Sequence, residues 1–177
     1  MTQPEVSIIL VSYNQESYIS DACQSILNQD YESPLEIIIS DDNSTDNTFT
    51  IIQEIVKNYR GIHKIKLNKN EENLGLIENI NKAVTLTRGN LIIYAAGDDI
   101  AYKNRAKILV DTYLRQSVKH KIYLVHSSIK KIDQNSKPIA MELPPLTIKN
   151  ISCNDMINEF SLVIGATCLW HRDLFNI

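Results

Sequence analysis

Val6-Ser7-Ile8-Ile9-Leu10-Val11 is the stretch that decides the fold of this chain of 177 residues. It is short, apolar and rich in β-branched residues, a pattern typical of a strand that is buried on both faces. Apolar residues at helical spacing follow over residues 15–28, and Leu35–Ser40 is a second run like the first. The N-terminal part of the chain therefore predicts a strand, a helix and another strand in succession.

The same alternation continues along the chain. Further helices are expected around residues 49–59, 77–84 and 106–114, and further strands at His63–Leu67, Leu91–Ala96 and Ile122–His126. Strand and helix alternate four times over about the first 125 residues, which predicts an α/β fold with a mostly parallel, Rossmann-like sheet. Helices should cover both faces in a three-layer α/β/α arrangement, and we expect a single domain over residues 1–177.

Two of these helices carry signals at their ends. Ser44 or Asp46 is expected to cap the helix that begins near residue 49, because short polar side chains accept hydrogen bonds from free N–H groups there. Gly89 is expected to end the helix at residues 77–84 as its left-handed cap.

The last third of the chain is less regular. Ser128–Asp133 is expected to pair with the strand at residues 122–126 as a hairpin or an extension. Three prolines predict a non-regular segment after Lys137. A short helix near Cys153–Phe160 and an apolar strand at Leu162–Trp170 are expected to close the chain.

Composition and charge exclude some classes of function. A net charge of -3 without a clustered basic face predicts no nucleic-acid partner. Cys23, Cys153 and Cys168 lack metal-ligand spacing, and the first and last lie among apolar residues, which favours buried thiols in a reducing compartment. The sequence shows no secretory signal and no apolar run long enough to span a bilayer. We therefore expect a cytoplasmic protein.

Polar residues follow the predicted strands at the points where ligands bind in such sheets, beyond the carboxyl ends of the strands. These segments are Ser12-Tyr13-Asn14, Asp41-Asp42-Asn43-Ser44, residues 68–73 and Gly97-Asp98-Asp99. Because parallel strands end at the same edge of a sheet, we expect these side chains to converge there. Loops that only turn a corner are often polar too, so the chemistry of each segment has to be weighed.

Asp98 and Asp99 are the first candidates for chemistry. Adjacent carboxylates repel each other unless a cation or a proton intervenes. Their hard oxygen atoms suit Mg²⁺ or Mn²⁺, which also take phosphate oxygens as ligands. The alternative is that one of the two only caps the following helix.

The segments after the first two strands offer contacts for a base. A carboxylate such as Asp42 can accept a hydrogen bond from a base N–H, although Asp42-Asn43-Ser44 can equally be a helix-capping turn. Tyr13 can stack on a base or belong to the packing. No Gly-x-Gly-x-x-Gly or P-loop motif follows the first strand, which argues against dinucleotide oxidoreductases and P-loop enzymes.

The ordered set of motifs resembles the N-terminal half of family 2 glycosyltransferases, which have a GT-A fold. It consists of residues 6–14, Ser25-Ile26-Leu27-Asn28-Gln29, residues 41–48, Asn73-Leu74-Gly75 with Asn79 and Asn81, and Gly97-Asp98-Asp99. The resemblance covers about residues 5–130. It implies an inverting enzyme that binds a nucleoside-diphosphate sugar, a UDP-sugar in our interpretation, with Mn²⁺ or Mg²⁺.

The resemblance also implies roles for individual residues. Val11 and Tyr13 would contact the nucleoside, with Tyr13 near the base, and Ser12 and Asn14 would belong to the same nucleotide-sugar site. Asp42 would hydrogen-bond uracil, and Asn79 would belong to the same nucleotide-sugar site. Asp98 would face the ribose or the sugar and share the metal with Asp99, which would hold the ion that bridges the diphosphate.

The chain departs from the family pattern at two positions. Ala96 stands where the family's Asp-x-Asp metal motif has its first aspartate, so the division of roles between Asp98 and Asp99 stays open. Ile80 stands where relatives often have an arginine, so one phosphate or base contact must come from elsewhere.

No catalytic residue is assigned. In relatives a general-base carboxylate takes the proton of the acceptor hydroxyl, and we expect that group to lie beyond Ile177. Among late residues, Asp155, Glu159 and Asp173 are expected at the surface, and Trp170 and His171 in packing positions rather than at the acceptor or the metal.

The expected partners follow from the same interpretation. They are the nucleoside-diphosphate sugar and a saccharide or lipid-linked acceptor in polysaccharide or cell-surface glycan synthesis. We also expect peripheral association with the inner face of the membrane and a homodimer in the full-length protein. A nucleotidyltransferase and a catalytically incomplete nucleotide-binding module are the alternatives. The first would want a Gly-rich phosphate loop, where this chain has Ser12-Tyr13-Asn14.

Overall fold

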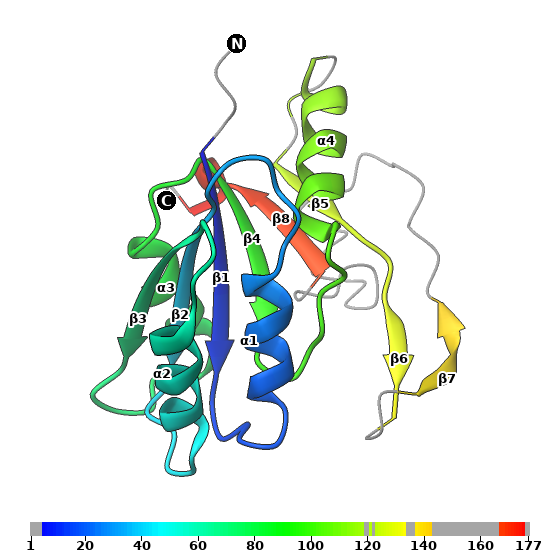
Figure 1. Cartoon of the computed structure of the whole chain (residues 1–177). Helices are drawn as coiled ribbons and strands as arrows, with labels where there is room; N and C mark the ends of the chain where they lie inside the picture. The colour runs from blue at the N-terminus through cyan, green and yellow to red at the C-terminus, as the bar shows by residue number, and fades with distance from the viewer. Residues whose placement is uncertain (1–4, 119–120, 122, 134–136, 143–166, 176–177) are drawn as a thin grey trace.

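The computed structural model describes residues 5–118, 121, 123–133, 137–142 and 167–175. The elements in chain order are β1 (Val6–Ser12), α1 (Ile19–Leu27), β2 (Glu36–Asp41), α2 (Thr48–Asn58), β3 (Lys64–Lys69), α3 (Leu76–Thr85), β4 (Leu91–Ala96), α4 (Arg105–Ser117), β5 (Leu124–His126), β6 (Lys130–Ile132), β7 (Pro138–Glu142), β8 (Cys168–His171) and η2 (Arg172–Phe175). The four predicted alternations of strand and helix are confirmed (Figure 1).

Six strands form the main sheet in the order β3-β2-β1-β4-β8-β5. The pairs β1–β2, β1–β4 and β2–β3 are parallel, whereas β8 runs antiparallel to both of its neighbours. The apolar run at the N-terminus becomes the central strand β1, and all seven of its residues are buried. The sequence pattern is therefore explained by two strand neighbours and two covered faces.

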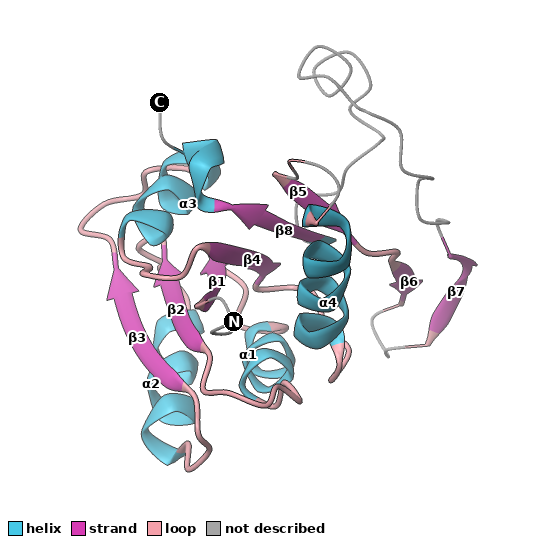
Figure 2. Ribbon diagram, turned by 90° about the horizontal axis from the view of Figure 1, so that it is seen from above, coloured by secondary structure: helices cyan, strands magenta, loops and turns pink. Residues whose placement is uncertain are grey.

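The helices lie in two layers, one on each face of the sheet (Figure 2). Ile8 and Leu10 of β1 pack with α1, α2 and α4 in the larger core. Ile9 and Val11 point to the opposite face, where they pack with α3. Alternate residues of the strand thus pack in two separate cores, one on each face of the sheet. This arrangement confirms the predicted three-layer α/β/α fold.

The carboxyl ends of the parallel strands lie level with one another. Ser12 of β1 is in register with Asp41 of β2, which in turn is in register with Lys69 of β3. On the other side, Val11 is in register with Ala96, the last residue of β4. The polar segments that follow these strands therefore meet at one edge.

The pairing expected for Ser128–Asp133 is wrong. Strand β6 pairs with β7 in a separate two-stranded sheet, and no described residue pairs it with β5. Asp133 N donates to the carbonyl of Lys137 at 2.8 Å, and Lys137 N donates to Asp133 Oδ1 at 2.9 Å, so the end of β6 is bonded to the residue before β7. Pro138 is the first residue of β7, where a missing N–H is tolerated, so the predicted non-regular segment begins with a strand over residues 138–142, and Pro144 and Pro145 lie outside the described residues.

The ends of two helices also differ from expectation. Helix α3 ends at Thr85, and Gly89 is not its left-handed cap. A Cβ on Gly89 would lie 2.6 Å from Ser7 N, so this glycine permits a close approach to β1 instead. Neither Ser44 nor Asp46 is the N-cap of α2: that residue is Asn47, whose side chain makes no capping bond, although Asp46 Oδ1 accepts from Thr48 N, the first residue of the helix, at 2.9 Å.

Some expectations fall on other parts of the chain. The helix near Cys153–Phe160, and the predicted strand at Leu162–Trp170 up to residue 166, lie outside the described residues. The described end of that strand is β8. Cys23 and Cys168 are both fully buried thiols, as the sequence predicts, and burial raises their pKa to about 12 and about 11.

Candidate functional site

A pocket of about 390 Å³ opens at the carboxyl edge of the sheet. Its walls come from the segments after β1, β2 and β4, from the loop that precedes α3, and from α3 itself. The residues that line it are Val11, Ser12, Tyr13, Gln15, Asp42, Asn73, Gly75, Leu76, Asn79, Tyr94, Ala96 and Asp98. Six of the eight residues expected to bind nucleotide sugar or metal are in this set, and Asn14 and Asp99 are not.

The segment after β1 forms one wall of the pocket. Ser12 is buried and donates to Asp41 Oδ2 at 3.2 Å, whereas the Tyr13 ring is 44% exposed at the mouth. Asn14 adopts a positive φ of 50°, a conformation that asparagine tolerates better than most residues. Its side-chain Oδ1 accepts from Thr45 N at 2.9 Å. Asn14 therefore fastens the β1 loop to the β2 loop and leaves Tyr13 free at the surface.

The two aspartates at the end of β2 have different structural roles. Asp41 is fully buried and accepts from Ser44 N at 2.9 Å, so it holds the turn together. Asp42 lines the pocket and accepts three N–H bonds: from Asn70 Nδ2 at 2.7 Å, from Leu74 N at 2.9 Å and from Gly75 N at 2.8 Å. The carboxylate of Asp42 thereby anchors the loop between β3 and α3. No pattern in the sequence predicts this contact.

Asn79 belongs to a buried network of amides at the floor of the pocket. Its Oδ1 accepts from Ser40 Oγ at 2.6 Å and from Asn70 Nδ2 at 3.1 Å, and its Nδ2 donates to the Ser40 carbonyl at 3.2 Å. Asn68 Nδ2 joins the network by donating to Ser40 Oγ and to Asn70 Oδ1. Asn79 lines the pocket, but most of its hydrogen-bonding capacity is used within the protein.

The segment after β4 lies directly against the segment after β1. A Cβ on Gly97 would collide with Gln15 Oε1 and come within 3.0 Å of Ser12 Cβ. Asp98 and Asp99 follow on the surface, and neither carboxylate accepts a hydrogen bond within the described residues. Partial desolvation, together with the negative charge of Asp98, raises the pKa of Asp99. Glycine is thus needed where two loops meet, and the paired carboxylates project beyond that contact.

Arg105 is a charged residue of this region that sequence reasoning missed. It begins α4, and its guanidinium donates to the Tyr94 carbonyl at 2.9 Å. Burial lowers the pKa of Arg105 to about 10, while the positive charge of Arg105 counters the rise in the pKa of Asp99. The sequence signal that could have identified Arg105 is a basic residue in the first turn of the helix that follows an aspartate pair.

Gln15 is a second residue that the sequence does not single out. Its Oε1 is buried and has no hydrogen-bond partner among the described residues. The inner end of the Gln15 side chain is therefore an unsatisfied polar group on the pocket wall, and no spacing in the sequence could have shown it.

Asp98 and Asp99 fit the requirements of Mg²⁺ or Mn²⁺. These ions keep several waters and are bound through one or two carboxylates plus phosphate oxygens, rather than by an all-protein cage. Within the described ranges no group of three His, Cys, Asp or Glu side chains gathers in a metal-binding arrangement. The two adjacent carboxylates supply the protein part of such a donor set.

The late residues lie where packing was expected. Trp170 stacks on Tyr94 with ring centroids 5.4 Å apart. His171 is in register with Leu91, the first residue of β4, and stacks on Tyr113 with centroids 6.0 Å apart. His171 therefore lies at the opposite end of β4 from Asp98.

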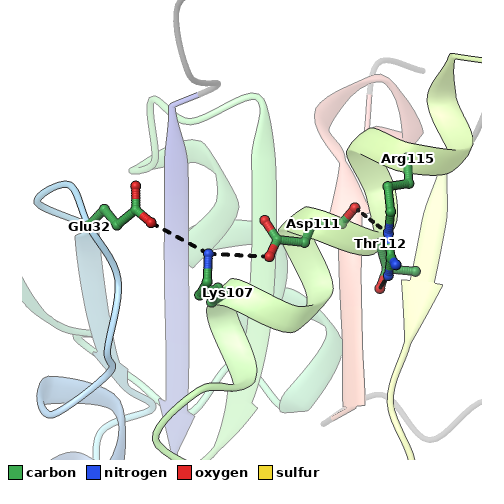
Figure 3. Close-up of polar contacts among 5 residues, drawn as sticks. All are labelled: Glu32, Lys107, Asp111, Thr112 and Arg115. Carbon is green, nitrogen blue, oxygen red and sulfur yellow. Dashed lines mark hydrogen bonds and ion pairs between the residues drawn. The ribbon is translucent and has the colours of Figure 1, made fainter.

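A second concavity of about 360 Å³ lies on the outer face of α4, where Asp111 and Arg115 are part of the lining. Figure 3 shows the charged contacts there: Lys107 Nζ lies 3.5 Å from Glu32 Oε1 and 3.3 Å from Asp111 Oδ2. All these side chains are solvent-exposed, and exposed pairs of this kind contribute little to stability. This surface gives no indication of chemistry, and its carboxylates serve as controls for those of the pocket.

No helix in the described part of the chain is both long enough and apolar enough to cross a membrane.

Comparison with known proteins gives three kinds of match. Residues 7–175 match the family model described as glycosyl transferase family 2. A curated relative from Campylobacter jejuni, the GalNAc(5)-diNAcBac-PP-undecaprenol beta-1,3-glucosyltransferase, is 35% identical over 96 residues, which cover 54% of this chain and 30% of that protein.

Two solved structures share the fold. TarS of S. aureus, in complex with UDP, has a TM-score of 0.68 and 21% identity over 97% of this chain and 48% of that chain. The mannosyltransferase PcManGT of Pyrobaculum calidifontis, in complex with GDP-Man and Mn²⁺, has a TM-score of 0.71 and 18% identity over 99% of this chain and 46% of that one. This chain spans less than half the length of these three proteins.

Proposed function

The chain belongs to glycosyl transferase family 2, and we propose that its pocket binds a UDP-sugar for transfer of the sugar to a hydroxyl acceptor. The observation that carries this proposal is the convergence of Tyr13, Asp42 and Asp98 on one pocket at the carboxyl edge of the sheet. An exposed ring, a buried carboxylate and an exposed carboxylate around one pocket match the parts of a nucleoside-diphosphate sugar. The volume of about 390 Å³ is in the range of small-molecule sites.

The base would bind between Tyr13 and Asp42. Tyr13 is exposed at the mouth, so its ring can stack on a base without moving any core residue. Asp42 Oδ2 accepts a single N–H bond, from Gly75, and keeps capacity for one more donor. Uracil N3–H is such a donor. Asn79 supports this part of the site from the floor of the pocket.

The ribose, the sugar and the diphosphate would lie toward β4. Asp98 lines the pocket and can accept from a sugar hydroxyl, and Asp98 with Asp99 would hold Mn²⁺ or Mg²⁺. When bound, the ion stabilises the charge that develops on the departing diphosphate. The proximity of Arg105 to Asp99 keeps a positive charge beside this carboxylate pair.

The transfer would be an in-line displacement with inversion at the anomeric carbon, in which a carboxylate takes the proton of the acceptor hydroxyl. We assign this general base to none of the described residues. The Campylobacter relative acts on an undecaprenol-linked saccharide, which supports a saccharide or lipid-linked acceptor and a role in cell-surface glycan synthesis.

Nucleotide binding by the chain tests the proposal. Isothermal titration calorimetry with UDP should show binding that requires Mn²⁺ and is lost in Asp99→Ala. Asp111→Ala is the matched control, because Asp111 is an exposed carboxylate on α4 that does not line the pocket. It should bind UDP like the unmodified chain. Absence of metal-dependent binding to the unmodified chain would overturn the proposed site.

A further inference from the structure

The hydrogen bonds of Asp42 leave it with one acceptor position for a ligand. An ionised carboxylate offers about four acceptor positions, two on each oxygen. Oδ1 accepts from Asn70 Nδ2 at 2.7 Å and from Leu74 N at 2.9 Å, so both of its positions are used. Oδ2 accepts from Gly75 N at 2.8 Å. The carboxylate of this pocket-lining residue can therefore take one more N–H donor, on Oδ2.

The orientation of the Asn70 amide is fixed by its other contacts. Its Oδ1 accepts from Asn68 Nδ2 at 2.9 Å, and its Nδ2 donates to Asn79 Oδ1 at 3.1 Å as well as to Asp42. A flipped amide would place its oxygen against the Asp42 carboxylate, acceptor against acceptor, and its NH₂ group against the Asn68 donor. The N–H of Asn70 is thus held on Asp42 Oδ1 by the whole network.

Uracil and guanine make different demands on a carboxylate. The Watson–Crick edge of uracil offers one donor, N3–H, between two carbonyl oxygens. Guanine offers two adjacent donors, N1–H and the 2-amino group, which pair with a carboxylate only if each oxygen can accept one. With N1–H on Oδ2, the 2-amino group of guanine would meet an oxygen whose positions are already filled by Asn70 and Leu74.

From this geometry we propose that Asn70 is a specificity-determining residue that makes the pocket a uracil site and excludes guanine. The inference rests on the proposed function, since it presumes that a nucleoside diphosphate occupies the pocket. It goes beyond that function by assigning the choice of base to a residue that need not touch the base. A polar group that binding leaves without a partner weakens binding, and this is the basis of the discrimination.

Calorimetric titration of the unmodified chain with UDP and with GDP, each with Mn²⁺, measures the selectivity directly. UDP should bind at least about tenfold more tightly than GDP, which corresponds to one unpaired polar group. Asn70→Ala frees one position on Asp42 Oδ1, so the ratio of the two dissociation constants should fall several-fold toward one. Asn58→Ala is the matched control: Asn58 is an exposed asparagine at the end of α2 that neither lines the pocket nor contacts Asp42, and the ratio should stay within about twofold of the unmodified chain.

The outcomes separate the inference from the proposed function. If the unmodified chain binds neither nucleotide, the proposed function itself fails. If it binds both with similar affinity, and both are lost in Asp42→Ala, the function stands and the inference is overturned. An unchanged ratio in a folded Asn70→Ala variant also overturns it. Should Asn70→Ala fail to fold, the ratio measured on the unmodified chain still decides whether the site excludes guanine.

Discussion

The chain has two Asp-Asp pairs, each at the end of a buried parallel strand, and the structure treats them in opposite ways. Asp41 and Asp42 after β2 are almost completely buried, and their carboxylates hold the turn to α2 and the loop before α3. Asp98 and Asp99 after β4 are exposed, and neither accepts a hydrogen bond within the described residues. The same dipeptide near the end of a parallel strand is a structural anchor in one case and a pair of available ligands in the other.

The difference shows how the two halves of the site are prepared before any ligand binds. On the proposed base side, Asp42 is already held in place by three N–H donors. On the proposed phosphate side, the carboxylates of Asp98 and Asp99 accept no hydrogen bond from a described residue, so they are available to a cation. Position after a strand therefore identifies both pairs as candidates, but only the surrounding donors decide what each pair can do.

Replacing each type of aspartate by alanine gives the largest contrast. Asp42→Ala removes the acceptor of three N–H groups, so the free energy of unfolding should fall by about 2–4 kcal/mol. Asp98→Ala removes an exposed side chain and should change it by less than about 0.5 kcal/mol. Urea denaturation followed by circular dichroism measures both. Equal losses in the two variants would contradict the distinction between anchor and ligand.

Gly97→Ala tests the contact that brings the two sides together. The new methyl group would collide with Gln15 Oε1 and press on Ser12, so we expect a loss of about 1–3 kcal/mol in the same denaturation experiment. The double variant Gln15→Ala/Gly97→Ala should recover part of the loss, because it removes one of the colliding groups. If the losses of the two single variants simply add, the methyl group is accommodated without Gln15.

The pH dependence of stability is a finer test of the exposed pair. The pKa of Asp99 is raised above its ordinary value of 3.8, so the native state binds the proton more tightly than the unfolded state does. Ionisation of Asp99 therefore lowers stability as the pH rises through its native pKa, and has no effect well below 3.8. Asp99→Asn should be slightly more stable than the unmodified chain at pH 7 and equal to it near pH 3. A difference that is the same at both pH values would contradict this cause.

The fold was largely predictable, because buried parallel strands are continuous apolar runs. Val6–Val11 and Leu91–Ala96 were located to within a residue for this reason. The wrong predictions fall at residues such as proline and glycine, whose presence is compatible with more than one local structure. Pro138 indicated an irregular segment, yet a proline is compatible with the first position of a strand. Gly89 resembled a helix cap. Glycine is needed there because the backbone of Ser7, which is distant in sequence, leaves no space for a side chain.

The candidate site was predictable in position but not in detail. The rule that ligands bind at the carboxyl ends of strands places Asp42 and Asp98 in one pocket. Asn14 was grouped with the pocket residues, whereas its side chain fastens two loops. The contacts of Gln15 and Arg105 depend on how separate loops pack, and such packing leaves no periodic trace in the sequence.

Strand β8 has a consequence for the order in which the molecule can be completed. It inserts between β4 and β5, and Arg172 just after it donates to the Gly89 carbonyl at 2.9 Å and to Thr87 Oγ1 at 2.7 Å. Until residues 168–172 have left the ribosome, β4 has an unpaired edge made of apolar residues, a template for association with other chains. During that interval the nascent protein is prone to aggregation, and the interval ends when β8 pairs with the edge of β4.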